Sequence, residues 1–419
     1  MSRRLLLATL LPVLVLYGAD PNTRWLELRR IANAAVRAGN FSQLRTALLE
    51  LQPLMPGNAR NAYLMAVAEA RLAKPAAALP RLQQWADMGI VLDLAADPNF
   101  ASLRVLPPFA EILCQVENNQ KPVSRSSQAF AIVEADLIPE DLAWDPQTKR
   151  FFISSVRQAK ILTGDGLEFA RTPWAAFALR ADTKRRTLWA TTAWSSNCAP
   201  CEAGDKGKTA LLAFDLDSGQ LKQRIESPVP GTLGDMTLSK SGDLFLTEST
   251  NGAVFHLREG NSNFERLDEA GDFPSPQTPA LSDDGKTLYV RDYLRGLAAI
   301  DLKSRRIAWL TPAPNVATSG VDGLYVYRKT FVAIRNGTKP PRVIRFPHDL
   351  KSQETLEANS PALGEPTHGT LVGNRFFFIT NTGWGEYDEE GRKKPGSALV
   401  VSAVHSIRLQ RFAKLKKQG

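Results

Sequence analysis

One pattern of apolar and polar positions recurs along residues 139–409. Each copy has an apolar strand, a polar turn with Gly or Asp, and an aromatic strand ending in small polar residues. The six copies are PEDLAWDPQTKRFFISS (139–155), residues 174–192, GDMTLSKSGDLFLTES (234–249), QTPALSDDGKTLYVRD (277–292), VDGLYVYRKTFVAIRN (321–336) and THGTLVGNRFFFITN (367–381). Their spacing is about 45 residues, and repeats of that period are typical of propellers, in which each copy forms one blade. The sequence therefore predicts a six-bladed β-propeller over residues 128–409.

A strand is also expected before the first copy. Residues Gln128–Ala135 (QAFAIVEA) alternate between apolar and polar positions, as a half-buried strand does. We predict that this strand pairs with the last blade, because closing the ring with strands from both ends of the chain leaves no exposed sheet edge.

A helical pattern fills residues 22–116. Apolar residues recur at helical spacing from Trp25 to Ala35, and further helices are expected over Phe41–Leu54, Asn58–Leu72 and Pro75–Met88. Similar segments start at Gly39 and Ala73, a shift of 34 residues, which is the tetratricopeptide period. We therefore predict an α + β multidomain protein, with a tetratricopeptide-like helical domain (22–116), a polar linker (117–127) and the propeller. The helical domain either braces the propeller or holds a partner peptide.

The two ends of the chain suggest where the protein works. Basic residues Arg3 and Arg4 precede the apolar run Leu5–Tyr17, the layout of a signal peptide, which we place at residues 1–19. We expect a periplasmic or secreted protein with no stable membrane span after cleavage; an uncleaved anchor is the alternative. The net charge of +9 lies partly in the basic tail 410–419. Without stacking aromatics among the basic residues, this charge does not predict a nucleic-acid partner.

The cysteines favour a structural role. Cys198 and Cys201 form a CxxC in a polar, Gly-containing stretch, with no second pair and no nearby His. Zinc is therefore poorly supported, as is a redox motif at a helix start. We predict a loop disulfide in an oxidising compartment, and a buried thiol at Cys114 in the helical region.

Aligning the copies yields one residue per blade at the start of the strand nearest the central channel. In blade order these ring positions are Glu140, Ala175, Gly234, Gln277, Asp322 and His368, and Asp235 follows the third. Buried charges must be paired or bound to a metal, and calcium takes oxygen ligands of the kinds that Glu140, Gln277 and Asp322 offer. His368 suits calcium poorly and is a candidate general base. The alternative is that the ring only hydrogen-bonds channel water.

Further polar residues end the second strands of the copies. Glu248, Asp292, Asn336 and Asn381 supply oxygens that face the same channel only if the strand registers allow it. Trp384 and Tyr387, in the following loop, either wall one mouth of the channel or are ordinary loop aromatics, and we favour the second interpretation.

Three phrases, PEDLAWDP (139–146), SDDGKTLYVRD (282–292) and VDGLYV (321–326), resemble the six-bladed family that includes senescence marker protein, gluconolactonases and strictosidine-synthase-like proteins. The resemblance implies a divalent metal, often calcium, held in the channel by a Glu, an Asn and an Asp from three blades. Glu140 matches the Glu and Asp322 the Asp, whereas Gln277, one methylene longer, stands in place of the Asn. Near blade three, where the family has its substrate-binding Asn, this chain has Gly234 and Asp235.

Two hypotheses of function follow. In the first, the protein is a metal-dependent hydrolase of lactones or small esters; Glu140, Gln277 and Asp322 hold the cation, and Asp235 or His368 moves the proton. In the second, it is a non-catalytic scaffold whose helical domain and one propeller face bind proteins or envelope glycans.

Overall fold

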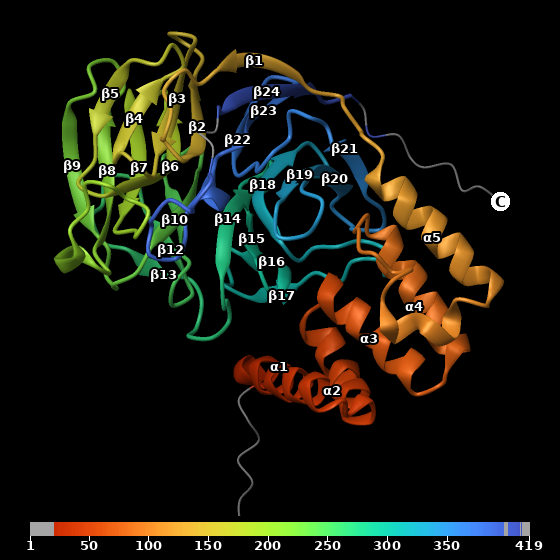
Figure 1. Cartoon of the computed structure of the whole chain (residues 1–419). Helices are drawn as coiled ribbons and strands as arrows, with labels where there is room; N and C mark the ends of the chain where they lie inside the picture. The colour runs from red at the N-terminus through yellow and green to blue at the C-terminus, as the bar shows by residue number, and fades with distance from the viewer. Residues whose placement is uncertain (1–20, 398–400, 411, 413–419) are drawn as a thin grey trace, which may run out of the picture.

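The structure is a computed structural model that describes residues 21–397, 401–410 and 412 (Figure 1). The predicted signal peptide lies outside these residues, as does most of the basic tail. Within the described part of the chain, we find no helix with both the length and the apolar character needed to cross a membrane.

Among the described residues, five α-helices and one 3-10 helix precede the propeller. They are α1 (Pro21–Ala38), α2 (Phe41–Leu54), α3 (Ala59–Arg71), α4 (Pro75–Asp87), η1 (Pro98–Leu103) and α5 (Pro107–Gln120). The side chains of Asn40 and Asn58 cap α2 and α3 by accepting hydrogen bonds from the first-turn amides of Gln43 and Asn61. Helix α5 runs into the segment predicted as linker, because residues to Asn119 still bury side chains against the helical core.

The described residues from Ser127 onward form a six-bladed β-propeller of four-stranded antiparallel sheets, which confirms the predicted fold class. Blade one consists of β2 (Pro139–Asp145), β3 (Arg150–Ser155), β4 (Lys160–Thr163) and β5 (Glu168–Arg171). Blade two consists of β6 (Ala175–Asp182), β7 (Thr187–Ala193), β8 (Thr209–Asp215) and β9 (Leu221–Glu226). Blade three consists of β10 (Leu233–Leu238), β11 (Leu244–Glu248), β12 (Ala253–Leu257) and β13 (Glu265–Arg266).

The remaining blades follow the same order. Blade four consists of β14 (Pro276–Leu281), β15 (Thr287–Asp292), β16 (Gly296–Asp301) and β17 (Ile307–Trp309). Blade five consists of β18 (Val321–Tyr327), β19 (Thr330–Arg335), β20 (Arg342–Pro347) and β21 (Glu354–Ala358). Blade six consists of β22 (Gly369–Val372), β23 (Arg375–Thr380), β24 (Ala403–Arg408) and β1 (Ser127–Ala131).

Strands from both ends of the propeller close the ring in blade six. Strand β1 pairs antiparallel with β24, so the spatial order is β1-β24-β23-β22. The predicted pairing of the first strand with the last blade is therefore confirmed.

A β-bulge recurs near the start of the innermost strand in blades one to five. In blade one, for example, Pro139 pairs with Ser155 but Leu142 pairs with Ile153, so one residue is extra. Bulges redirect side chains out of the regular alternation of a strand. Glu140 and Asp322 both lie within such a bulge, which turns their side chains toward the channel.

The helices pack against loops of blades four and five (Figure 1). The carbonyl of Gly57 accepts hydrogen bonds from the amides of Thr318 and Ser319, and Ala317 is buried in the helical core. The segment between β17 and β18 therefore belongs to both parts of the molecule. The tetratricopeptide-like nature of the helices stays a prediction.

The cysteines give one confirmation and one correction. Cys198 and Cys201 form a disulfide in the loop between β7 and β8. Cys114, predicted to be buried, is exposed: Ile112 and Val116 turn one face of α5 toward the core, and a residue midway between them lies on the opposite face.

Candidate metal centre at the channel mouth

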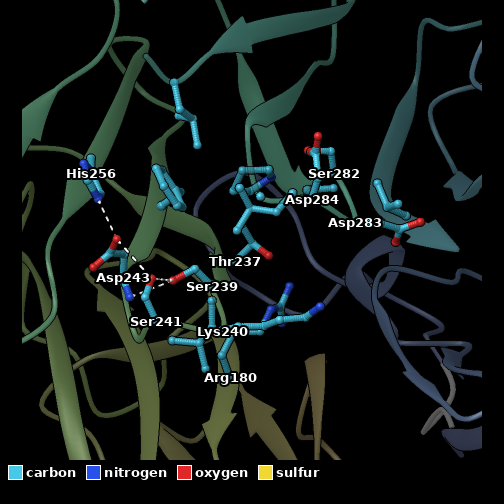
Figure 2. A pocket seen from close by; sticks show the side chains of 18 of the residues that line it. Arg180, Thr237, Ser239, Lys240, Ser241, Asp243, His256, Ser282, Asp283 and Asp284 are labelled. Carbon is cyan, nitrogen blue, oxygen red and sulfur yellow. Dashed lines mark hydrogen bonds and ion pairs between the residues drawn. The ribbon is translucent and has the colours of Figure 1, made fainter. Parts of the chain in front are cut away.

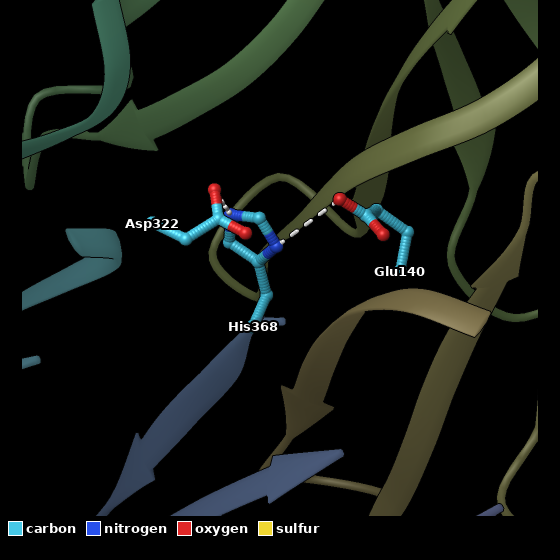
Figure 3. A group of neighbouring side chains, drawn as sticks. All are labelled: Glu140, Asp322 and His368. Atoms are coloured by element: carbon cyan, nitrogen blue, oxygen red, sulfur yellow. Dashed lines mark ion pairs between the residues drawn. The ribbon is translucent and has the colours of Figure 1, made fainter. Parts of the chain in front are cut away.

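Three carboxylates and one imidazole from four blades meet at one end of the channel. The residues are Glu140 on β2, Asp235 on β10, Asp322 on β18 and His368 immediately before β22. His368 Nε2 lies 2.9 Å from Asp235 Oδ1 and 3.9 Å from Asp322 Oδ1, and His368 Nδ1 lies 3.5 Å from Glu140 Oε1. Figure 3 shows the imidazole between Asp322 and Glu140.

Neutral donors fix the outer oxygen of two of these carboxylates. Trp384 Nε1 donates to Glu140 Oε2 at 2.7 Å, and Asn336 Nδ2 donates to Asp322 Oδ2 at 2.7 Å. Each carboxylate therefore keeps its other oxygen, Oε1 or Oδ1, on the side of His368. Donors of this kind orient metal ligands without neutralising their charge.

The partners of His368 indicate which ring nitrogen carries the proton. The Thr278 hydroxyl donates to the Asp322 carbonyl at 2.9 Å, so its oxygen can accept from His368 Nε2, 3.2 Å away. With Asp235 also facing Nε2, the neutral ring holds its proton there. Nδ1 then points a lone pair at Glu140, and it has no hydrogen-bond partner among the described residues. A proton or a cation must lie between these two acceptors.

A divalent cation fits this arrangement. Glu140, Asp322 and His368 each offer one ligand atom, and all three atoms lie within 4.8 Å of one another. Metal–ligand bonds of about 2.0–2.6 Å allow a single ion to reach all three.

Burial and mutual charge shift the pKa values of the cluster. Burial raises the pKa of Asp322 to about 7; His368 opposes this, and the negative charges of Glu140 and Asp235 add to it. Burial acts against a charged His368, but the carboxylates of Asp235 and Asp322 hold its pKa well above the ordinary value. In the absence of a metal ion, a protonated imidazole supplies the positive charge that these carboxylates require.

An ion pair lies below the cluster in the channel. Arg180 Nη1 is 2.6 Å from Asp141 Oδ2, and Asp141 also accepts hydrogen bonds from the amides of Leu142 and Leu179. Tyr325 stands on the same side, where its hydroxyl accepts a hydrogen bond from Gly369 N at 2.8 Å. This layer fixes the inner strands of several blades to one another.

Other polar residues suggested by the sequence take different places. Gln277, predicted as a metal ligand, donates its amide nitrogen to Ser275 Oγ at 3.2 Å. Glu248 and Asp292 cap their own loops: Glu248 accepts from the amides of Thr232, Thr250 and Asn251, and Asp292 from those of Ser275, Leu294 and Arg295. The carboxylate oxygens of Glu248 and Asp292 are therefore used by backbone amides. Of the four residues that end second strands, the two amides, Asn336 and Asn381, remain candidates for the channel, and Asn336 does reach the cluster.

For Trp384 the structure agrees with the alternative that we did not favour, in which this residue lies at the channel mouth. We expected an ordinary loop aromatic, but its indole nitrogen holds Glu140. Trp384 also packs beside Tyr387 and the disulfide cysteines, in a cluster that includes Cys198. The only signal available was the position of Trp384 shortly after the second strand of blade six, where a loop can reach the channel mouth.

Comparisons with known proteins reach only as far as the fold. No protein-family model matches the chain, and no curated protein matches it. The chain has a six-bladed propeller fold. Similar solved structures include a luciferin-regenerating enzyme (13% identity, TM-score 0.47, covering 68% of this chain and 95% of that one). They also include the PQQ-bound aldose sugar dehydrogenase from Streptomyces coelicolor (12% identity, TM-score 0.44, 68% and 100% covered) and a nidogen/laminin complex (13%, 0.43, 52% and 80%). At these values the likeness carries no information about chemistry.

Proposed function

We propose that the channel mouth is a divalent-cation site and that the protein hydrolyses small esters or lactones there. The observation that supports this most directly is the set of three free ligand atoms, one each on Glu140, Asp322 and His368, within 4.8 Å of one another. A site that only ordered channel water would not need two carboxylates and an imidazole at this spacing.

The proposed ion is calcium or a transition metal of similar charge. Carboxylate oxygens suit calcium, which was the expectation from the sequence. The imidazole nitrogen suits Mn²⁺ or Zn²⁺ better. Comparing the three ions on the same protein separates these cases.

When bound, the cation would polarise the substrate carbonyl and acidify a water molecule. In this proposal Glu140, Asp322 and His368 hold it, whereas Gln277, predicted as a ligand, donates to Ser275 instead. Trp384 and Asn336 keep the two carboxylates in place. Asp235, hydrogen-bonded to His368 Nε2, accepts the proton of the attacking water. The small ring residues Ala175 and Gly234 leave space for a substrate on one side of the channel.

The test is hydrolysis of a panel of lactones and aryl esters by protein loaded with Ca²⁺, Mn²⁺ or Zn²⁺. We expect activity with one ion, its loss with a chelator, and its loss in Asp322→Asn. Glu226→Gln, at an exposed carboxylate of β9, is the matched control and should retain activity. If no substrate is hydrolysed with any of the three ions, the hydrolase hypothesis is wrong.

His368→Gln separates two roles for the imidazole. If His368 moves the proton, this variant binds the cation as the wild type does but turns over slowly. If His368 is a metal ligand, the variant loses cation affinity as well. In either case the side chain contributes to the site.

The second candidate is the binding scaffold. Its support is a cavity of about 520 Å³ with a largely apolar lining, between α2, α3, α4 and residues Thr311–Pro314. Under this hypothesis the channel binds no cation, and substitution of Asp322 affects neither a ligand nor a partner.

A further inference from the structure

A cavity of the propeller lies at the opposite end of the channel from the metal centre. It has a volume of about 870 Å³ and opens between blades three and four. Its walls come from the far ends of the innermost strands, including Leu238, Leu281 and Val326, and from the turns Ser239–Ser241 and Ser282–Gly285. The volume is within the range of small-molecule sites, about 300–1,000 Å³.

Arg180 stands at the inner end of this cavity with donors to spare. Its Nη1 bonds Asp141 and the Leu179 carbonyl, both at 2.6 Å, while Nε and Nη2 make no hydrogen bond to a described residue. The ion pair with the fully buried Asp141 holds the guanidinium in place. The remaining N–H groups therefore present a fixed fork to the cavity, suited to a planar or tetrahedral anion.

Lys240 adds a second positive charge. It lies in the turn between β10 and β11, is exposed, and makes no ion pair with any residue in the described part of the chain. Figure 2 shows Arg180 and Lys240 on the same side of the cavity, across from Ser282, Asp283 and Asp284.

Two of the four acidic residues of the lining, Glu265 and Asp243, have close partners. Glu265 pairs with Arg305 and Arg258. Asp243 accepts from Glu259 N at 2.9 Å and faces His256 at 3.5 Å. The charge of Glu265 is therefore balanced by arginine, and Asp243 is held by neighbours other than Arg180 and Lys240.

The opposite wall offers groups that bind hydroxyls. Ser282 and Asp284 are hydrogen-bonded to each other at 2.6 Å, and the carboxylate of Asp283 accepts no hydrogen bond from a described residue. A ligand that places an anionic group at Arg180 and Lys240 can direct hydroxyl groups to Asp283 and Ser282.

We propose that this cavity is a second binding site, for a small hydroxylated organic anion such as a sugar acid or a sugar phosphate. It differs from the metal centre in its side chains: three carboxylates surround one imidazole there, whereas this cavity has cationic donors on one wall and hydroxyl and carboxylate groups on the other. The site stands independently of the proposed hydrolysis.

The experiment is calorimetric titration of the full protein with gluconate, glucose 6-phosphate, inorganic phosphate and neutral glucose, with chelator present. We expect the two sugar anions to bind and glucose not to bind, with an affinity that falls as salt is added. The preference between gluconate and glucose 6-phosphate identifies the anionic group. Binding of glucose as tight as that of gluconate, or no binding by either anion, would overturn the proposal.

Binding measurements on variants test whether the anion lies at Arg180 and Lys240. Lys240→Gln should weaken binding about fivefold to twentyfold, because a hydrogen bond to a charged group is lost. Lys184→Gln, at an exposed lysine in the corresponding turn of blade two, should have no effect. Arg180→Lys keeps a charge for Asp141 but loses the fork, and should also weaken binding. Unchanged affinity in Lys240→Gln would contradict the assignment. Loss of binding in Asp322→Asn would also contradict it, because this result would place the anion at the metal centre.

Discussion

At the scale of single residues, Asp322 combines a cost in stability with the capacity to bind a cation. Its pKa of about 7 means that the folded protein holds a proton which the unfolded chain has already lost near pH 4. The free energy of unfolding therefore falls as the pH rises through this window. A bound cation would remove the penalty, since it favours the charged carboxylate.

Substitution of Asp322 should separate stability from binding. In chelator at pH 8, we expect Asp322→Asn to be more stable than wild type by about 1–3 kcal/mol, with the difference disappearing toward pH 4. The amide oxygen of the new asparagine can still accept the hydrogen bond from Asn336 Nδ2. Urea denaturation at several pH values measures the effect. A variant less stable than wild type at pH 8 would show that the charged carboxylate gains more from His368 than its burial costs.

Cation affinity should depend on pH in a defined direction. His368 has a raised pKa and Asp322 titrates near 7, so a cation must displace protons from this cluster. Affinity should rise between pH 6 and pH 8, by about tenfold per pH unit for each proton released. Calorimetry in buffers of different ionisation enthalpy would count the protons, and a flat profile would contradict the shared site.

The sequence located the residues of the cluster but not their partners. Glu140, Asp235, Asp322 and His368 follow from aligning the copies, because equivalent positions of a propeller share one channel. Trp384 depends on the path of a long loop, which the repeat does not determine.

At the scale of elements, the contact between the helices and blade five depends on Gly57. This residue has φ +70°, and a Cβ there would lie 2.5 Å from Thr318 Oγ1 and 2.7 Å from Pro312 Cγ. Gly39 has a similar φ of +66° with nothing within 4 Å. Comparing alanine substitutions at Gly39 and Gly57 therefore separates the cost of backbone strain from the cost of a steric clash.

We therefore expect Gly39→Ala to cost about 1 kcal/mol from the left-handed backbone alone. Gly57→Ala should cost about 1–3 kcal/mol more, because Thr318 or Pro312 must move. Thermal unfolding of both variants tests this. Equal losses of stability would mean that the contact between Gly57 and blade five adjusts to the added methyl group at no energetic cost.

Strand β19 ends in an arginine that is costly to bury. Arg335 is fully buried, none of its side-chain nitrogens has a partner among the described residues, and burial with the neighbouring Arg342 lowers its pKa to about 9. Replacing unpaired buried charge by an apolar side chain of similar size commonly stabilises a protein.

Arg335→Met should accordingly raise the free energy of unfolding by about 1–4 kcal/mol. Arg342→Met is the control and should lower it, since Arg342 donates to the Asn119 carbonyl and to Thr355. Chemical denaturation distinguishes the two. A large destabilisation by Arg335→Met would reveal an ion or water bound to the guanidinium.

Periodicity was sufficient to predict helices α2, α3 and α4 and the two inner strands of each blade, but not the outer strands. The ends of α2 agree with the prediction, and Asn58, expected to begin a helix, caps α3. Helix α5 could not be delimited from polarity, because Asn119, a polar residue, is buried and donates to the carbonyls of Ala86 and Ile90.

At the scale of the whole molecule, the two mouths of the channel differ in chemistry. One mouth gathers Glu140, Asp235 and Asp322 around His368 beneath the loop of Trp384. The other opens into the large cavity with Arg180 and Lys240. The repeat predicts one channel with six blades; the difference between its ends arises from substitutions within single copies, such as Arg180 in blade two.

The most direct test of the account is calorimetric titration of Ca²⁺, Mn²⁺ and Zn²⁺ into the metal-free protein. We predict one site for at least one of these ions with a Kd below about 1 mM, abolished in Asp322→Asn and retained in the Glu226→Gln control. If none of the three ions binds, or if Asp322→Asn binds as the wild type does, the channel mouth is not a metal centre.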